Sequence, residues 1–138
     1  MKRVLLFGAA GFVGSYLSQE FIENGYKVYG SDKNQGSMLP KEVKFSIVDV
    51  LDVKQIEWQI SKISPDIIIN LAAISSVGAS WNIPQLTISV NVVGALNILE
   101  VVKQSKKKPK VMFVGSSEEY MIADVPMDEK TSLNAGNA

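Results

Sequence analysis

The chain has 138 residues, 46% of them apolar and 20% charged, and its 14 basic residues balance 14 acidic ones. These values are typical of one soluble globular domain, and the balanced charge excludes a field that would draw the chain to nucleic acid or to a membrane. Because the chain has neither cysteine nor histidine, its chemistry must rest on a cofactor or on Ser, Tyr, Lys and carboxylate side chains, and no metal site is expected.

The first element along the chain is a short apolar strand at residues 3–7. It is too short for the apolar core of a signal peptide. We also expect no membrane-spanning segment, because no apolar stretch approaches the roughly 20 residues that a span needs. A cytoplasmic location follows as the default.

Short β-branched runs then alternate with longer helical patterns. The expected strands are residues 3–7, 27–30, 44–48, 66–71 and 111–114, and the expected helices are residues 12–24, 52–63 and 84–104. The apolar positions expected to face the sheet are Val13, Leu17 and Phe21 in the first helix, Ile56, Ile60 and Ile63 in the second, and Ile88, Val92, Ala95, Leu99 and Val102 in the third. This alternation predicts an α/β fold, a Rossmann-type doubly wound parallel sheet of five strands with flanking helices.

A glycine-rich loop, Gly8-Ala9-Ala10-Gly11-Phe12-Val13-Gly14, joins the first strand to the first helix. Glycine lets a ligand approach the backbone closely, and the N-terminus of the following helix favours an anion. The loop therefore predicts a site for the pyrophosphate of a dinucleotide. Its G-x-x-G-x-x-G spacing is one residue longer than the common fingerprint, and glycines also make ordinary turns, so the other strand ends must support this interpretation.

The second strand leads into Ser31-Asp32-Lys33, and Asp32 lies eighteen residues after Gly14. A carboxylate about 20 residues after the loop accepts hydrogen bonds from the adenosine ribose hydroxyls. The alternative is a solvated acid that opens a loop. Asp32 would also repel a 2′-phosphate, which favours NAD over NADP, whereas Lys33 could pair with that phosphate and leaves NADP open.

Small and polar residues follow the other strands as well. Asp49 and Val50 follow the third strand, where a carboxylate could accept from the adenine amino group or simply precede the next helix. The fourth strand ends in Asn70-Leu71-Ala72-Ala73-Ile74, where small residues could let the backbone run beside a cofactor or serve tight packing. Because ligands bind beyond the C-terminal ends of such strands, these positions complete the residues expected to bind the cofactor: Gly8, Gly11, Phe12, Val13, Gly14, Asp32, Lys33, Asp49, Val50, Leu71, Ala72 and Ala73.

Together these residues resemble the extended short-chain dehydrogenase/reductase family, the NAD-dependent nucleotide-sugar epimerases and dehydratases. The matching segments are residues 8–14, Asp32, Asp49-Val50, Asn70-Leu71-Ala72-Ala73, Asn91-Val92-Val93-Gly94 and Ser116-Ser117-Glu118-Glu119-Tyr120, in the family's order. Residues 75–80 and 115–120 are most similar to the branch that holds the GDP-mannose 4,6-dehydratases and the 4-keto-6-deoxy-sugar reductases.

The resemblance implies that NAD(P)⁺ takes a hydride from C4 of a nucleotide sugar. Ser116 would hydrogen-bond the reacting 4-oxygen, Glu118 would be the dehydratase base for the C5 proton, and Ser75 and Ser76 would contact the substrate. Without the resemblance, Ser116 belongs to a polar loop and Glu118 is a solvated acid. The family has glycine where Met121 stands, so the family's local backbone geometry is not carried over to this position.

The family's catalytic Tyr-x-x-x-Lys pair opens a helix after the segment that residues 127–138 resemble, and we expect no such pair in this chain. Residues 1–126 are therefore interpreted as a dinucleotide-binding domain and residues 127–138 as a tail that leads to that helix, with the substrate domain absent. We expect the chain alone to bind NAD(H) without turnover. The alternative is a stand-alone sensor or non-catalytic module. The fifth strand, left as an unpaired edge, predicts self-association, as in a homo-oligomer, or else modest stability.

Overall fold

Five strands form the centre of the molecule. They are β1 (Arg3–Phe7), β2 (Lys27–Asp32), β3 (Lys44–Ile47), β4 (Ile67–Asn70) and β5 (Lys110–Phe113). All four pairings are parallel, in the order β3-β2-β1-β4-β5. The chain therefore begins in the middle of the sheet and winds outward in both directions, which confirms the predicted Rossmann-type sheet of five strands.

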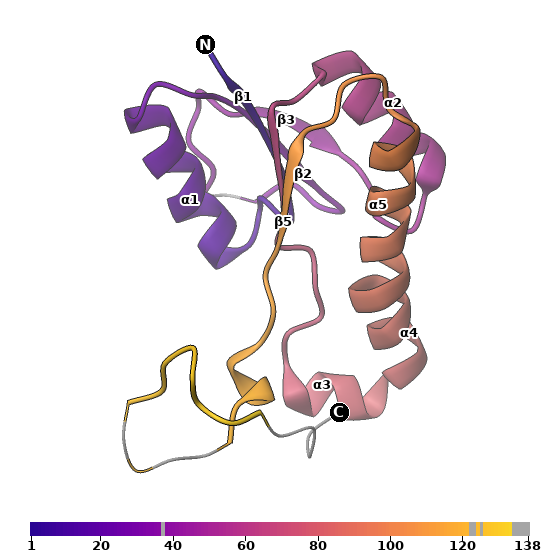
Figure 1. Cartoon of the computed structure of the whole chain (residues 1–138). Coiled ribbons are helices and arrows are strands. Elements are labelled where there is room, and N and C mark those ends of the chain that lie inside the picture. The colour runs from indigo at the N-terminus through magenta and orange to yellow at the C-terminus, as the bar shows by residue number, and fades with distance from the viewer. Residues whose placement is uncertain (37, 122–123, 125, 134–138) are drawn as a thin grey trace.

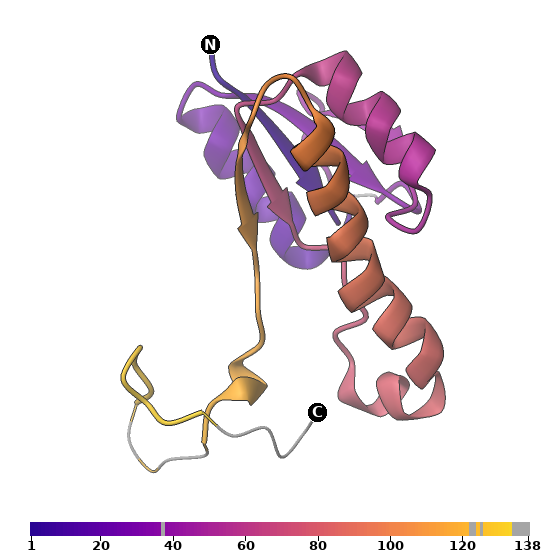
Figure 2. The ribbon, with the colours of Figure 1, turned by 45° about the vertical axis from the view of Figure 1, so that its right-hand side comes forward.

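The structure is a computed structural model that describes residues 1–36, 38–121, 124 and 126–133. Its helices are α1 (Phe12–Glu23), α2 (Val53–Ile63), α3 (Val77–Asn82), α4 (Pro84–Ile88) and α5 (Gly94–Gln104), with a π-helical turn η1 (Ser89–Val93) and a 3₁₀ turn η2 (Ser117–Glu119). Helix α1 covers one face of the sheet, whereas α2 and α5 cover the other (Figure 1). Helices α4 and α5 form one rod that extends past the strand ends, with α3 beyond them (Figure 2).

Two apolar clusters hold the helices to the sheet. The cluster on the α2 and α5 side consists of Leu5, Phe7, Val48, Val50, Ile56, Ile60, Ile63, Ile68, Ile98 and Val101. The cluster on the α1 side consists of Val4, Leu6, Ala9, Val28, Val43 and Ile69. Both faces of the sheet are thus apolar, because successive strand residues point to opposite faces and helices lie on each. The expected inner face of α2 is confirmed, since Ile56, Ile60 and Ile63 are all buried.

Helix α1 approaches the sheet through small residues, Gly14, Ser15 and Ser18, which are its buried positions. Leu17 and Phe21 pack against the adjoining cluster, as predicted. Val13 does not, because it is 57% exposed. The expectation for Val13 is wrong because the close approach of Gly14 to the glycine loop turns the neighbouring side chain outward.

Helix α2 begins with an elaborated cap. The Asp52 carboxylate accepts from the amides of Lys54 (3.0 Å) and Gln55 (3.2 Å), and from the Gln55 side chain (2.9 Å). In the usual capping box the third helical residue bonds back to the cap amide. Here the Gln55 side-chain oxygen instead accepts from the Asp49 amide at 2.9 Å. The cap therefore ties the start of α2 to the loop after β3.

The long helix from Pro84 to Gln104 turns to the sheet a face that agrees only in part with the one predicted. Val102 packs against the cluster on the α2 and α5 side, as predicted. Ile88, Val92 and Leu99 are instead exposed, and the buried positions are Gly94, Ile98 and Val101. The reason is a close contact at Gly94, where an added Cβ would lie 2.7 Å from Val50 Cγ2. The side facing away from the sheet carries an exposed apolar stripe of Ile88, Val92, Leu96 and Leu99.

This helix also corrects the expectation about membrane-spanning segments. Its 21 residues, Pro84–Gln104, are long and apolar enough to cross a membrane by length and composition, with 22% of the most apolar window buried. Counting only uninterrupted apolar runs missed it, because polar residues such as Ser89 and Asn97 interrupt the run while the other residues keep the mean hydropathy of the window at 1.5. In this fold its second half, α5, packs against the sheet and α2.

A polar network closes the opposite end of the sheet, where the strands begin. The Asp66 carboxylate accepts from the Arg3 amide (2.7 Å) and from the Lys107 ammonium (2.7 Å). These interactions, that of Lys107 first, hold the pKa of Asp66 below its ordinary value. Lys107 also donates to the Ser64 carbonyl, and Arg3 donates to the Ile63 carbonyl, so the network covers the end of α2.

The α1 side of the sheet is only partly covered in the part of the chain that the structure describes. Helix α1 contacts β1 and β2, whereas Met112 on β5 is 56% exposed and Val114, just after it, is 54% exposed. As predicted, β5 is an edge strand. The exposed apolar surface of this region therefore combines a free strand edge with an open face.

Candidate functional site

A cavity of about 280 Å³ opens beyond the C-terminal ends of β1 to β4. Its lining residues are Gly8, Gly11, Asp32, Lys33, Val48, Asp49, Val50, Leu71, Ala72, Ala73, Ile74, Leu86 and Val90. Nine of the twelve residues predicted to bind the cofactor are among them; Phe12, Val13 and Gly14 are not. Sequence reasoning missed the apolar residues Val48, Ile74, Leu86 and Val90, since nothing in their local pattern marks them as lining a cavity.

The first glycine of the loop lies where two strand ends meet. Gly8 has a φ of +78°, and an added Cβ would lie 2.5 Å from the Ala72 amide nitrogen. The amides of Gly8 and Ala9 both donate to the Ser31 carbonyl, at 2.8 and 3.1 Å. The end of β2 and the loop after β4 therefore determine the path of the glycine loop, and no larger residue fits at Gly8.

The third glycine lets the first turn of α1 approach this loop. An added Cβ at Gly14 would lie 2.6 Å from the carbonyl oxygens of Gly8 and Ala9. Gly11 precedes the helix in extended conformation and supplies no side-chain cap. The first amides of a helix lack acceptors within the helix, so this turn, which directly follows the loop, is suited to an anion.

Asp32 is held by the same loop. One carboxylate oxygen accepts from the Ala10 amide at 3.1 Å, and the other accepts from the Lys33 amide at 2.7 Å. Both bonds come from backbone groups, so the carboxylate has a defined position at the cavity while being only partly buried. Such a placement suits an acceptor for a pair of vicinal hydroxyls.

Asp49, at the end of β3, is bound on several sides. Its carboxylate accepts from the Leu51 amide at 2.9 Å and lies 3.3 Å from the Lys33 ammonium. Its own amide donates to Gln55. Asp32, Lys33 and Asp49 thus form one charged group at the cavity, contributed by two adjacent strand ends.

The long helix fixes two loops of the cavity through asparagine side chains. Asn91, in the π-helical turn, accepts from the Ile74 amide (2.8 Å) and donates to the Ile74 carbonyl (3.1 Å). Asn97 donates to the Val50 carbonyl at 3.0 Å. Asn91 belongs to a segment that carried the family resemblance, but no local pattern indicated that Ile74 is its partner. For both Asn91 and Asn97, the one available signal in the sequence was a polar residue within an otherwise apolar helix.

Three of the residues predicted to act on the substrate, Ser75, Ser76 and Ser116, are not among the described residues that line this cavity. Ser75 and Ser76 precede α3, where Ser76 accepts from the Ala79 amide at 3.3 Å and so caps the helix. Ser116 is exposed and directly precedes η2. The side chain of Glu118 lies outside the described residues. Helix α3 and the segment after β5 both extend beyond the C-terminal ends of the strands (Figure 2).

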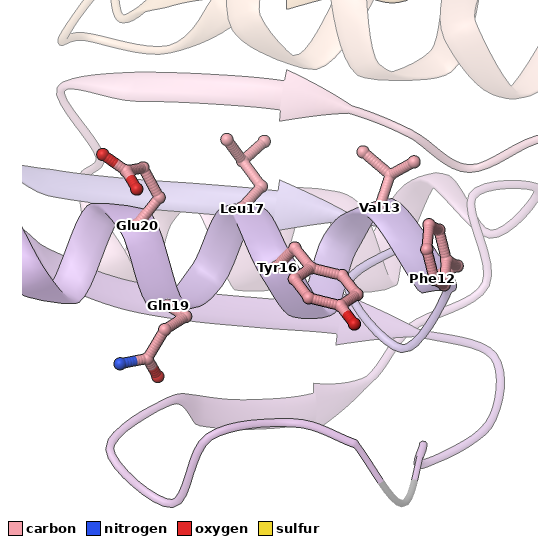
Figure 3. A pocket seen from close by; sticks show the side chains of 6 residues that line it. All are labelled: Phe12, Val13, Tyr16, Leu17, Gln19 and Glu20. Carbon is pink, nitrogen blue, oxygen red and sulfur yellow. The ribbon is translucent and has the colours of Figure 1, made fainter.

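Phe12 and Val13 belong to a second, wider hollow of about 550 Å³ along the outer side of α1. Figure 3 shows Val13 and Leu17 on one side of it, with Phe12 and Tyr16 beside each other at its edge. The ring centroids of Phe12 and Tyr16 are 5.0 Å apart. This hollow is a mainly apolar helix surface, so these side chains are separate from the charged cavity.

The expectation of no Tyr-x-x-x-Lys pair needs a correction of detail, because Tyr29 and Lys33 have this spacing. They lie on β2 and directly after it, not on a helix. Tyr29 packs against the cluster on the α2 and α5 side, whereas Lys33 is exposed at the cavity. The spacing here therefore does not place the two side chains on one face of a helix.

Comparison with known proteins gives consistent matches. A family described as "GDP-mannose 4,6 dehydratase" matches residues 5–138. The GDP-mannose 4,6-dehydratase of Yersinia enterocolitica is 31% identical over 148 residues, which cover 95% of this chain and 40% of that protein. The chain thus spans about two fifths of the length of this curated relative.

Solved structures share the fold over nearly the whole chain. UDP-glucose 4-epimerase of Thermus thermophilus, in complex with NAD, has a TM-score of 0.84 and 29% identity, covering 96% of this chain and 44% of that one. UDP-glucose 4-epimerase of Bifidobacterium longum, in complex with NAD⁺ and UDP, has a TM-score of 0.86 and 27% identity, covering 97% of this chain and 43% of that one.

Proposed function

Because the chain belongs to the GDP-mannose 4,6-dehydratase family, we propose that it is the NAD-binding portion of a nucleotide-sugar dehydratase or epimerase. The observation that carries the proposal is the cavity at the strand ends, where the glycine loop and the Asp32 carboxylate are held together by the bond from the Ala10 amide. Relatives crystallised with NAD support the choice of cofactor.

The residues of the cavity fit a dinucleotide. A Cβ at Gly8 or Gly14 would collide with backbone atoms, so the loop stays open to close approach by a pyrophosphate. Asp32 would accept from the ribose hydroxyls, and Asp49 would accept from the adenine amino group. The bound cofactor would supply a hydride acceptor for C4 of the sugar.

The substrate-side roles remain proposals for the same protein. Ser116 would hold the 4-oxygen, Glu118 would act as the base for the C5 proton, and Ser75 and Ser76 would contact the nucleotide sugar. The chain covers about two fifths of a relative's length, which supports a larger parent protein with a separate substrate domain. We infer that residues 1–138 alone bind the cofactor without turnover.

The test is a calorimetric titration of the 138-residue chain with NAD and with NADP, repeated on Asp32→Ala. We expect NAD to bind the wild-type chain and to bind Asp32→Ala more weakly, because the variant loses the acceptor for the ribose hydroxyls. Equal NAD affinity in both proteins would refute the role of Asp32. A clear dehydratase or epimerase rate from the chain alone would refute its inactivity.

A second candidate function is a stand-alone dinucleotide sensor. One observation favours it: the described cavity is lined by the cofactor-type residues and does not include Ser75, Ser76 or Ser116. Sequencing the transcript beyond the Ala138 codon distinguishes the two. A downstream Tyr-x-x-x-Lys pair followed by a substrate domain supports the enzyme, and a stop codon supports the sensor.

Self-association is also proposed. Two features support it. Strand β5 is an edge of the sheet whose backbone groups could pair with another chain. The long helix also carries an exposed apolar stripe that contact with another chain would bury, which consists of Ile88, Val92, Leu96 and Leu99.

A further inference from the structure

The cation nearest the predicted ribose site is already engaged. Lys33 Nζ lies 3.3 Å from Asp49 Oδ2, across the ends of β2 and β3. Lys33 follows Asp32 directly, yet only the backbone amide of Lys33, and not its ammonium, donates to the Asp32 carboxylate. Among the ion pairs of the described residues, none includes Asp32. The Lys33 ammonium is thus directed to the next strand end and away from its neighbouring carboxylate.

The two partners differ in how firmly they are held. The Asp49 carboxylate also accepts from the Leu51 amide, and the Asp49 amide donates to Gln55, so Asp49 is fixed to the cap of α2. The Lys33 side chain is 69% exposed, against 31% for Asp49. Asp49 is therefore the more firmly held partner, and Lys33 is the more exposed one.

Lys33 is the one cationic residue among the described residues that line the cavity. A phosphate on the 2′-oxygen of the adenosine ribose would place negative charge next to the Asp32 carboxylate, the proposed acceptor for the ribose hydroxyls. Lysine binds phosphate as a point charge and would favour that ligand if it were free to turn toward it. With Lys33 held by Asp49, a 2′-phosphate instead meets a group of three side chains with a net charge of −1.

We propose that Asp49 is a specificity-determining residue for the cofactor, because it holds Lys33 away from the ribose site and so favours NAD over NADP. The inference rests on the proposed dinucleotide binding and deepens it. Asp32 acts through repulsion and hydrogen bonding, whereas Asp49 acts by engaging the cation of the described cavity lining, Lys33. Selectivity then depends on the ends of two strands.

The test measures dissociation constants for NAD and NADP by calorimetry on the wild type, Asp49→Asn, Lys33→Ala and the double variant. Asparagine keeps an oxygen that can accept from the Leu51 amide and from an adenine amino group. We expect Asp49→Asn to lower the ratio of the NADP to the NAD dissociation constant by about two- to five-fold, the range of an exposed ion pair. In the Lys33→Ala background the same substitution should change the ratio much less.

Glu57→Gln removes an exposed acid on the outer side of α2 and serves as the charge control, with an unchanged ratio expected. Raising the salt concentration should reduce the effect of Asp49→Asn, since the contacts are exposed. NAD binding with the same ratio in wild type and Asp49→Asn overturns the inference, as does an equal effect of Asp49→Asn in both Lys33 backgrounds. Failure of the folded wild-type chain to bind NAD overturns the proposed function itself.

Discussion

A buried hydrogen bond links α2 to the strand that carries the predicted ribose acceptor. The Gln59 side-chain amide donates to the Ser31 hydroxyl at 2.9 Å, and both residues are almost completely buried. Ser31→Ala leaves the Gln59 donor buried without this acceptor, which should cost about 1–3 kcal/mol of unfolding free energy. Gln59→Met removes the donor with a side chain of similar volume and leaves the hydroxyl without its donor.

The double variant Ser31→Ala/Gln59→Met replaces both partners by apolar groups. Its loss should therefore be smaller than the sum of the two single losses, by about 1 kcal/mol or more. Urea unfolding followed by circular dichroism measures this, because 2 kcal/mol shifts the midpoint by roughly 1 M. The Ser31 carbonyl still accepts from Gly8 and Ala9, so folded variants should keep their affinity for NAD. Losses that add to within about 0.4 kcal/mol would refute the reasoning.

Three further predictions concern the loop, the polar network and the apolar stripe. Gly14→Ala should lower the unfolding free energy measured in urea by about 1–3 kcal/mol, because the new Cβ would press on the Gly8 and Ala9 carbonyls. The control Gly78→Ala, whose Cβ would have nothing within 4 Å, should be nearly neutral. Equal losses in the two variants would contradict this. The lowered pKa of Asp66 means that the stabilising contribution of its carboxylate is complete above about pH 4 and is lost as pH falls further. The loss of unfolding free energy in Asp66→Asn should therefore become smaller below about pH 4. A loss that stays constant with pH would disprove the connection between the pKa of Asp66 and stability. Leu96→Lys should shift sedimentation toward monomer while Ile47→Lys, on the exposed side of edge strand β3, does not; monomeric wild type would exclude self-association.

The strands and helix α2 could be predicted closely because local chemistry decides them. Apolar β-branched runs matched the strands to within two residues, and Asp52 with Gln55 marked the start of α2. The predicted cofactor residues at the strand ends also came together, since parallel strands bring their ends to one edge of a sheet.

The orientation of the long helix could not be predicted from its periodicity. Apolar residues occur on more than one of its faces, so the stripe through Ile88, Val92 and Leu99 fits a core face as well as the true one does. Contact at Gly94 and the bond from Asn97 to the Val50 carbonyl decide the orientation, and both depend on a partner more than 40 residues away in sequence. Separation in sequence also hides the link between Asn91 and Ile74, which are 17 residues apart, and the link between Gln59 and Ser31, which are 28 residues apart.

The central place of β1 has a consequence for how the chain acquires its cavity during synthesis. β1 pairs with β2 at Arg3 and Lys27, but its other neighbour begins at Ile67, opposite Val4. A nascent chain therefore carries β1 with one side open until residues 67–70 have emerged from the ribosome. Gly8 gains its contact with Leu71 and Ala72 only then. A dinucleotide that binds this loop thus stabilises the assembled sheet and takes no part in the first pairing of its strands.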